Sequence, residues 1–388
     1  MLNLAAGFLA EGREVDIVLC QAKGAFLDEI PAGATTIELE ATGGLRARWI
    51  IARSNLQDFF VRLRPVLLAK KTAPEVASIR ALQRYIVASQ PDVILSALPY
   101  ANLSAIWAKE LSGSRVPVIV SERIALLSYC AAPSNSRKWR WRYLPELVRR
   151  TYPRADRVIA VSDHVANELI TTIGLSQDSV VAVPNPVVDG ALRACAQQAL
   201  AHPWFRQDGP PVILGAGRLT EQKDFATLIH AFAAVRTDRE ARLVILGEGR
   251  LRDDLEQLVC TLGIQADVYM PGFVENPFQY MARASVLVLS SAYEGLPGVL
   301  IQALACGCPV VSTDCPGGSS EILEDGKYGA LVSIGKADEM AKAVLAELDD
   351  PTPREILLRR AEDFSVERAV NSYLALLDTA VNQAADRT

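Results

Sequence analysis

The feature that most constrains the fold is an alternation that runs along the whole chain. Short runs rich in Val, Ile and Leu are followed by longer stretches with helical periodicity. This order predicts βα units and a parallel sheet. In the first half we expect strands at 15–20, 92–97, 117–121, 157–162 and 180–184. In the second half the expected strands are 212–217, 242–249, 268–273, 285–290, 309–313 and 329–333.

With 388 residues the chain is too long for one ordinary core, so two domains are expected. The stretch VPNPVVDG separates the two series of strands, because proline cannot continue a strand. We predict an N-terminal domain over 1–188, a linker over 189–209, a C-terminal domain over 210–365 and a terminal helix over 366–388. The predicted fold class is α/β, with two Rossmann-like, doubly wound domains facing a central cleft. Ligands are expected there, at the carboxyl ends of the strands.

The first domain opens unusually, since residues 2–11 already have the pattern of a helix, ended by Gly12. A Rossmann-like domain normally begins with a buried strand and a Gly-rich turn, so its first strand is expected to be missing. The N-terminus has neither the basic n-region nor the cleavage pattern of a signal peptide, and no apolar run approaches the roughly 18 residues that span a bilayer. We therefore expect a cytoplasmic protein.

Charge is distributed unevenly along the chain. The net charge of −5 argues against a nucleic-acid partner, but residues 1–205 hold 23 Lys/Arg against 18 Asp/Glu. In segment 135–154, Trp139, Trp141 and Tyr143 are interleaved with the cations Arg137, Lys138, Arg140, Arg142, Arg149 and Arg150. Two interpretations stay open: a solvated helix face with its aromatic side chains turned to the core, or a patch on an anionic membrane or acceptor.

The cysteines predict neither disulfides nor a metal centre. Their number is odd, seven, and they lie in apolar surroundings without paired spacing, which is typical of reduced thiols. Cys306, Cys308 and Cys315 are close in sequence, but the three histidines are scattered elsewhere. We expect no bound metal and no cofactor.

One loop has the residues needed to hold a diphosphate. Gly215 and Gly217 end an expected strand, and glycine lets a ligand approach the backbone. Arg218 and Lys223 follow, and together they could neutralise two phosphates. The alternative is a surface loop with two unpaired cations. A second G-x-G at 247–249 lacks the third glycine and the downstream acid of a dinucleotide site, which disfavours NAD.

The stretch SSAYEGLPGVLIQALACG places an acid in a turn and a polar residue on the helix that follows. Pro297 suits a first helical position, and the exposed amides of such a helix attract anions. Glu294 could accept hydrogen bonds from sugar hydroxyls beside them. Gln302 lies among apolar neighbours and needs a polar partner. The alternative is an ordinary loop acid and a half-exposed helix glutamine.

These stretches together resemble the GT-B glycosyltransferases of family 4, a retaining family with an E-x7-E signature. The similar segments are PNPV, GRLTEQKDFATLIHAF, LVILGEG, MPGFVENPFQYMARASVLVLSSAYEGLP, ACGCPVVSTDCPGGSSEILEDGKYG and FSVERAVNSY, with looser similarity in PDVILS, VIVSER and ADRVIAVSDHVANEL. The resemblance implies three catalytic residues, Arg218 and Lys223 on the donor diphosphate and Glu294 on the donor sugar. It implies donor contacts from Gly217, Phe273, Val274, Glu294, Gly298, Val299 and Gln302.

The chain departs from the family pattern at two of its motifs. Gln302 stands where the second Glu of the signature would hold the ribose, which predicts weaker donor binding by about 1–2 kcal/mol. The strand near 117–121 is followed by Ser-Glu-Arg and not by a histidine. Glu122 or Arg123 could orient the acceptor or the phosphate; an ion pair at the strand end is the alternative.

The sequence therefore predicts a retaining, metal-independent glycosyltransferase. It would move a sugar from a nucleoside diphosphate, with uridine implied by the resemblance, to a glycan or lipid-linked acceptor in surface polysaccharide synthesis. We expect it in the cytoplasm or at the inner face of the plasma membrane. One alternative is a non-catalytic sugar-nucleotide-binding or partner protein of the same fold. Another is a sugar-nucleotide epimerase, for which no acid/base pair can be nominated.

Overall fold

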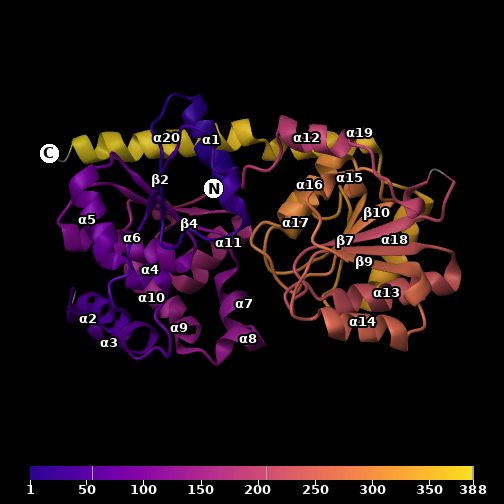
Figure 1. The fold of residues 1–388 in the computed structure, drawn as a ribbon, viewed down its shortest axis with the longest axis horizontal. Helices are drawn as coiled ribbons and strands as arrows, with labels where there is room; N and C mark the ends of the chain where they lie inside the picture. The colour runs from indigo at the N-terminus through magenta and orange to yellow at the C-terminus, as the bar shows by residue number, and fades with distance from the viewer. Residues whose placement is uncertain (55, 207, 387–388) are drawn as a thin grey trace. The chain divides into compact units, whose positions relative to one another are not determined.

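In the computed structural model, which describes residues 1–54, 56–206 and 208–386, the chain forms two compact units (Figure 1). The first unit contains residues 1–186 and 367–388, and the second contains 187–366. The chain enters and leaves the second unit at neighbouring points. There the Val187 amide donates to the Phe364 carbonyl over 3.1 Å, and the Val366 amide donates to the Val188 carbonyl over 2.9 Å.

The second unit is built on one parallel sheet of six strands, in the order β12-β11-β10-β7-β8-β9. Its strands are β7 (Val212–Ala216), β8 (Arg242–Leu246), β9 (Val268–Gly272), β10 (Val286–Leu289), β11 (Val310–Thr313) and β12 (Ala330–Val332). Its helices are α12 (Gly190–Gln197), α13 (Phe225–Asp238), α14 (Arg252–Thr261), α15 (Phe278–Met281), α16 (Gly298–Cys306), α17 (Ser319–Leu323), α18 (Ala337–Asp349) and α19 (Arg354–Ala361). All six predicted strands of this half are confirmed.

The core of the second unit explains why these strands are almost continuously apolar. Helices cover both faces of a parallel sheet, so side chains on both faces must be buried. Every residue of β10 and β11 is buried. Leu228 and Phe232 of α13 belong to the same buried cluster as Ile213 of β7 and Val288 of β10. This packing fixes the carboxyl ends of the central strands, where the candidate site lies.

The first unit has two parallel sheets that are not hydrogen-bonded to each other. One pairs β1 (Asp16–Leu19) with β2 (Thr35–Glu38), and the other has the order β3-β4-β5-β6. The strands of the second sheet are β3 (Ile94–Ala97), β4 (Val118–Glu122), β5 (Arg157–Ala160) and β6 (Val180–Ala182). The first unit thus opens with a helix, and β1 has β2 as its only strand partner among the described residues.

Helices surround these two sheets. They are α1 (Leu2–Ala10), α2 (Gly44–Ser54), α3 (Phe59–Arg62), the π-helix η3 (Leu63–Leu67), α4 (Pro74–Ala77), α5 (Ile79–Ser89), α6 (Pro99–Ser112), α7 (Leu126–Ala131), α8 (Pro133–Ser136), α9 (Trp139–Arg142), α10 (Leu144–Thr151), α11 (Asp163–Asn167) and α20 (Val366–Ala385). Figure 1 shows α20, in yellow, lying beside α1. A Cβ on Gly7 of α1 would lie 2.2 Å from Val370 of α20, so glycine permits this close approach.

The predicted boundaries differ from the observed ones in two places. Residues 190–197, predicted as part of a linker, form α12, whose N-terminus is capped by Asp189 accepting from the Leu192 amide over 2.8 Å. This helix packs on α15 and α16 of the second unit. The predicted terminal helix exists, but it belongs to the first unit, where Tyr373 is fully buried. A local pattern cannot show on which unit a helix packs.

One strand, β2, was not predicted from the sequence. Its residues TTIE are mostly exposed, so they lack the apolar run by which the other strands were recognised. Among the described residues, no helix has both the length and the apolar composition needed to cross a membrane.

Candidate active site

The candidate site lies at the carboxyl ends of β7 and β10, which are neighbours in the sheet of the second unit. Their register pairs Ile213 with Val286 and Leu214 with Leu287. The loop after β7 carries Lys223, and the loop after β10 carries Glu294. Residues 71 positions apart are thereby brought together at one edge of the sheet.

Lys223 and Glu294 form a buried ion pair. The Lys223 Nζ donates to Glu294 Oε1 over 2.6 Å, and their side chains are 16% and 9% exposed. The Ser291 hydroxyl donates to the same carboxylate oxygen over 2.6 Å. Low solvent exposure strengthens these charge-assisted bonds, so the carboxylate is held in one orientation.

Hydrogen bonds to backbone carbonyls also hold the two loops. The Ser290 hydroxyl donates to the Lys223 carbonyl over 2.7 Å, and the Gln222 side-chain amide donates to the Tyr293 carbonyl over 3.0 Å. The Glu294 amide donates to the Pro316 carbonyl over 2.8 Å. Next to it, Gly317 has a φ of 134°, and a Cβ there would lie 2.6 Å from the Glu294 carbonyl oxygen. Glycine is required at this position because both the conformation and the space exclude a side chain.

The two glycines at the carboxyl end of β7, Gly215 and Gly217, serve different purposes. Gly215 lies within the strand, and a Cβ on it would lie 2.8 Å from Leu228 and 3.0 Å from Phe225. The absence of a side chain at Gly215 therefore lets α13 pack closely. The prediction that a ligand approaches the backbone at this glycine does not hold. Gly217 has a φ of 155° and contacts the Lys223 stem. Gly247 packs on the Gly217 carbonyl, which accounts for the second G-x-G as a tight turn.

Helix α16 presents its N-terminus at the same edge. Pro297 precedes it and provides no side-chain cap. A Cβ on Gly298 would meet nothing within 4 Å, so space is open in front of the first turn. The amides of Gly298 and Val299 have no recorded acceptor among the described residues, as expected for a first turn. Gln302, in the second turn, is half-buried, and no hydrogen bond of its side chain is recorded in the described part of the chain.

Three other predicted donor residues lie at the carboxyl ends of nearby strands. Arg218 directly follows the β7 turn and is exposed, and its guanidinium has no ion pair with a described residue. Phe273 and Val274 follow β9, and the Phe273 side chain is 72% exposed. An exposed aromatic ring there offers a stacking face for a nucleotide base. Among the predicted donor residues that the structure describes, Lys223 and Glu294 are joined by a hydrogen bond, and Gly217 contacts the Lys223 stem.

Glu122 and Arg123 lie at the end of β4 in the first unit. The Glu122 carboxylate is fully buried; it accepts from the Tyr152 hydroxyl over 2.9 Å and from the Arg123 amide over 3.1 Å. Burial raises its pKa to about 7. The Arg123 guanidinium interacts with Tyr373 and with the sulfur of Met1. No ion pair between Glu122 and Arg123 is recorded, and the burial of Glu122 favours a structural role.

Two interpretations were open for segment 135–154: a solvated helix face with its aromatic side chains turned to the core, or a patch on an anionic membrane or acceptor. The structure has features of both. Trp141 packs edge-on against Tyr100 and Tyr129, with ring centres 5.5 and 5.1 Å away, and it is half-buried. Tyr143 accepts a hydrogen bond from Arg64 over 2.7 Å. Trp139, in contrast, is 44% exposed. Of these three aromatic side chains, Trp139 is exposed, whereas Trp141 and Tyr143 are half-buried.

The seven cysteines are free thiols. Cys306, Cys308 and Cys315 are buried, and burial raises the pKa of the Cys306 thiol to about 12. Within the ranges that the structure describes, no group of three or more His, Cys, Asp or Glu side chains is arranged to share a metal ion.

Comparison with known families identifies the chain. Residues 1–189 match the family model described as Glycosyltransferase Family 4, and residues 210–350 match the one described as Glycosyl transferases group 1. Two Rossmann-like units with parallel sheets and this site define a GT-B glycosyltransferase. The chain belongs to family 4 of these enzymes, the group 1 glycosyl transferases.

Two curated relatives are named for undecaprenol-linked glycans. The chain is 33% identical over 216 residues to N-acetylgalactosamine-N,N'-diacetylbacillosaminyl-diphospho-undecaprenol 4-alpha-N-acetylgalactosaminyltransferase of Campylobacter jejuni, covering 56% of this chain and 57% of that protein. It is 28% identical over 326 residues to a second Campylobacter jejuni enzyme, a GalNAc-alpha-(1->4)-GalNAc-alpha-(1->3)-diNAcBac-PP-undecaprenol alpha-1,4-N-acetyl-D-galactosaminyltransferase, covering 81% and 82%. The chain matches 49 to 57% of the length of several curated relatives.

A solved structure shares the fold over almost the whole chain. The sucrose-phosphate synthase of Thermosynechococcus elongatus superimposes with a TM-score of 0.73 at 19% identity, covering 97% of this chain and 91% of that one. At this identity the similarity is one of fold.

Sequence reasoning did not find the residues that hold Glu294 in place. Ser291, Ser290 and Gln222 bind the two loops, and Thr313 adds a bond of 2.6 Å to the Ser291 carbonyl. A signal was present, because an apolar strand that ends in Ser-Ser places hydroxyls at the carboxyl edge of the sheet.

Proposed function

We propose that this glycosyltransferase moves a sugar, with retention of configuration, from a nucleoside diphosphate, most simply UDP, to a lipid-linked glycan acceptor. The observation that carries the proposal is the Lys223–Glu294 pair at the edge of the sheet, beside the open N-terminus of α16. A cation, helix amides and an oriented carboxylate suit a diphosphate and a sugar joined to it.

The donor would be held by residues of the second unit. Arg218, Lys223 and the amides of Gly298 and Val299 would face the diphosphate. Since Lys223 and Glu294 neutralise each other, the exposed Arg218 supplies the uncompensated positive charge. Glu294 would accept hydrogen bonds from the sugar, with its orientation set by Ser291.

The nucleoside would extend along the same edge of the sheet. Gln302 would bind the ribose through its amide oxygen, without the charge that a glutamate would add. Phe273 and Val274 would lie against the base, where an aromatic face favours stacking.

The reaction would break the bond between the sugar C1 and the diphosphate oxygen and form one from C1 to the acceptor oxygen. Both oxygens would lie on the same face of the sugar, which gives retention. The proton of the acceptor hydroxyl would pass to the departing diphosphate, so no protein base is required. Arg218, Lys223 and the helix amides would stabilise the charge that develops on the leaving group. No metal ion is needed in this scheme.

The acceptor proposal rests on the relatives. Both Campylobacter enzymes are named for acceptors on diphospho-undecaprenol or PP-undecaprenol, which are membrane-anchored. By analogy we propose that this chain works on a lipid-linked intermediate of surface polysaccharide synthesis, at the inner face of the plasma membrane, with segment 135–154 near the bilayer.

A thermal-shift panel with UDP, GDP, ADP and CMP tests the donor site. A ligand present at about 100 times its dissociation constant should stabilise the chain by roughly 2.7 kcal/mol. We expect a selective shift with one diphosphate, reduced in Lys223→Ala. Transfer is then assayed with and without EDTA, and the anomeric configuration of the product is read by NMR. Nucleotide binding without transfer to any acceptor would favour the non-catalytic alternative, and inversion would exclude the scheme above.

A further inference from the structure

One surface of the first unit combines exposed apolar side chains with cations. It is formed by α2, α3, η3, the residues that follow η3, and α9, which pack against one another. We name it the basic–aromatic surface. Its exposed apolar residues are Leu45, Trp49, Phe60, Leu68 and Trp139, with Phe60 80% and Leu45 71% exposed. Its exposed cations are Arg46, Arg53, Lys70, Lys71, Arg137 and Lys138.

The outer stripe of α2 has a clear amphipathic order. Leu45, Trp49 and Arg53 are spaced at intervals of four, so they lie on one face of the helix. All three are exposed, and the Arg53 guanidinium lies 5.5 Å from the centre of the Trp49 ring. Ala47 and Ile51, on the other side, are fully buried. The exposure of Trp49 is therefore not a failure of packing, because the helix already has an apolar inner face.

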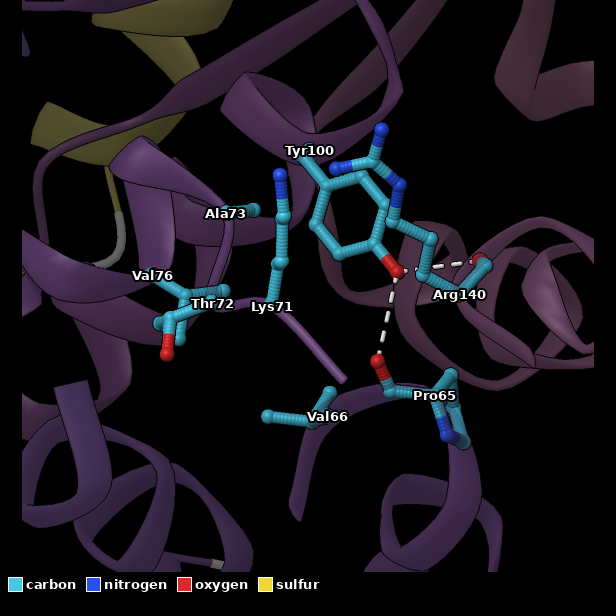
Figure 2. Close-up of a pocket in the computed structure, with 8 residues that line it drawn as sticks. All are labelled: Pro65, Val66, Lys71, Thr72, Ala73, Val76, Tyr100 and Arg140. Carbon is cyan, nitrogen blue, oxygen red and sulfur yellow. Dashed lines mark hydrogen bonds between the residues drawn. The ribbon is translucent and has the colours of Figure 1, made fainter. Parts of the chain in front are cut away.

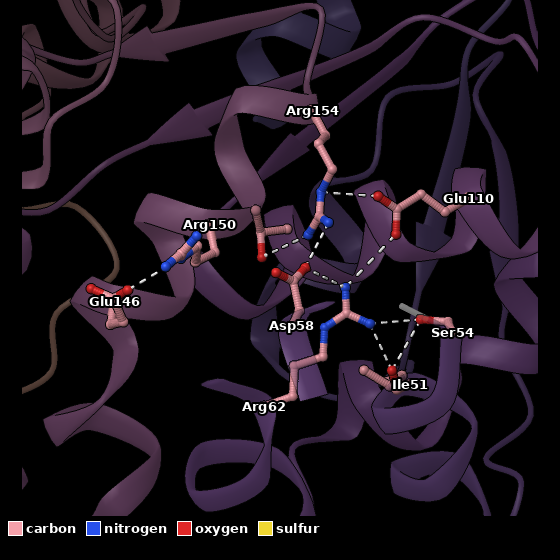
Figure 3. A network of polar contacts seen from close by, with 9 residues as sticks. Ile51, Ser54, Asp58, Arg62, Glu110, Glu146, Arg150 and Arg154 are labelled. Carbon is pink, nitrogen blue, oxygen red and sulfur yellow. Dashed lines mark hydrogen bonds and ion pairs between the residues drawn. The ribbon is translucent and has the colours of Figure 1, made fainter. Parts of the chain in front are cut away.

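A buried network of hydrogen bonds and ion pairs fixes the orientation of α3 within this surface. Figure 3 shows Arg62, which is fully buried and donates to the Ile51 carbonyl over 2.7 Å and to the Ser54 hydroxyl over 2.6 Å. It also pairs with Asp58 at 3.1 Å, and Arg154 pairs with the same carboxylate at 2.6 Å. Phe60 is two residues from Arg62, so the two side chains leave the helix on opposite sides. With Arg62 held inside, Phe60 must face outward.

Further contacts join η3 and the residues after it to α2 and α9. The buried Arg48 of α2 donates to the carbonyls of Leu67 and Ala69. Figure 2 shows the pocket where Lys71 and Arg140 lie on either side of Tyr100, whose hydroxyl donates to the Arg140 carbonyl over 3.0 Å. Two cations from distant parts of the sequence, Lys71 and Arg140, thus line one pocket.

The charge of this region is almost entirely positive. Residues 44–72 contain seven Lys/Arg and a single acid, Asp58. That acid is buried and already paired with Arg62 and Arg154, so it does not offset the exposed cations. Aromatic and aliphatic side chains set among lysines and arginines suit the interface of an anionic bilayer, where rings enter the headgroup region and cations meet phosphates. The net charge of −5 for the whole chain disfavours a nucleic acid here.

We propose that the basic–aromatic surface docks the first unit on an anionic phospholipid bilayer. Leu45, Trp49, Phe60 and Leu68 would enter the interfacial layer, and the cations around them would meet lipid phosphates. The main contact is thus α2, α3 and η3, to which segment 135–154 adds Trp139 and flanking cations. This inference rests on the proposed function in one respect: an enzyme with a lipid-linked acceptor needs to be held at the membrane.

Vesicle flotation of the full chain tests the inference. The probes are vesicles of phosphatidylglycerol with phosphatidylethanolamine and vesicles of phosphatidylcholine alone. We expect binding to the anionic vesicles that weakens as salt is raised. Phe60→Ser should lower the partition coefficient about tenfold, from the loss of one apolar side chain in the interface. Lys70→Ala with Lys71→Ala should lower it roughly 30-fold, at about 1 kcal/mol for each cation.

Matched controls separate this surface from general effects. Phe26→Ser removes another largely exposed phenylalanine, 67% exposed, outside the surface, and this variant should bind vesicles as the unaltered chain does. Lys336→Ala with Lys342→Ala removes two exposed lysines from the second unit and should also have no effect. Equal losses in the controls, or no binding to anionic vesicles, would overturn the proposal.

Two further measurements identify other occupants and separate this proposal from the donor site. Sedimentation without lipid would show a concentration-dependent dimer, abolished by Phe60→Ser, if a second copy covered the surface instead. Nucleotide-induced thermal shifts should be the same in all these variants. Vesicle binding without any nucleotide shift would support this surface and reject the proposed donor site, and the reverse result would reject the surface alone.

Discussion

The Lys223 ammonium and the Glu294 carboxylate lie 2.6 Å apart, although each belongs to a loop after a different strand. The adjacency of β7 and β10 in the sheet brings them together, and Ser291 shares the carboxylate oxygen. The pair therefore depends on the strand order of the second unit. Disrupting it should lower both the stability of this unit and its affinity for the donor.

We expect Lys223→Ala to destabilise the second unit by about 2 kcal/mol, because it leaves a buried carboxylate without its cation. In a double-mutant cycle with Glu294→Ala, urea denaturation should give a coupling energy of about 1–3 kcal/mol. The matched control is Lys327 with Glu324, a pair at 2.7 Å whose side chains are 61% and 40% exposed. Its coupling should stay below about 0.5 kcal/mol. Equal couplings in the two cycles would mean that burial adds nothing to the first pair.

Glu294→Ala should abolish transfer, whereas Gln302→Glu should preserve or improve it. A glutamate at 302 would strengthen a ribose hydrogen bond by charge, tightening donor binding by about 1–2 kcal/mol. Isothermal titration with the selected nucleoside diphosphate measures this. Gln257→Glu, at an exposed position on α14, adds the same charge and should change nothing. If Gln302→Glu destroyed binding, the ribose assignment would be wrong.

Two glycines should respond oppositely to alanine. Gly215→Ala should cost about 1–3 kcal/mol of stability, because its Cβ would lie 2.8 Å from Leu228. Gly298→Ala meets open space and should change stability by less than about 1 kcal/mol, while weakening nucleotide binding by crowding the α16 N-terminus. Chemical denaturation and nucleotide titration of both variants distinguish the two roles. A Gly298→Ala variant that binds normally would remove this turn from the phosphate site.

Glu122 should make stability depend on pH. Burial raises the pKa of its carboxyl from the ordinary 4.5 to about 7, so the folded chain binds this proton more tightly than the unfolded chain. The resulting stabilisation is fully present below about pH 4.5 and is lost as the pH rises through about 7. Glu122→Gln should flatten the fall in unfolding free energy between these values. An unchanged pH profile in that variant would show that Glu122 is not the group responsible.

Much of the fold could be predicted because buried parallel strands leave a strong local signature. The apolar runs of β7, β8, β10 and β11 are covered on both faces, so they stand out in the sequence. The exposed strand β2 has no such run and was missed. Membership of α12 and α20 in their units could not be predicted, since a helix pattern states which face is apolar but not what covers it.

The sequence by itself determined the βα order and the family, because strand ends, glycines and a helix start are local features. Only the tertiary structure decided how these residues are used. It paired Lys223 with Glu294, assigned Gly215 to helix packing, and buried Glu122 beside Tyr152. It also left Trp49 and Phe60 exposed while turning Trp141 inward. Pairing and burial depend on residues distant in the chain, and so they arise only when the sheet and its covering helices assemble.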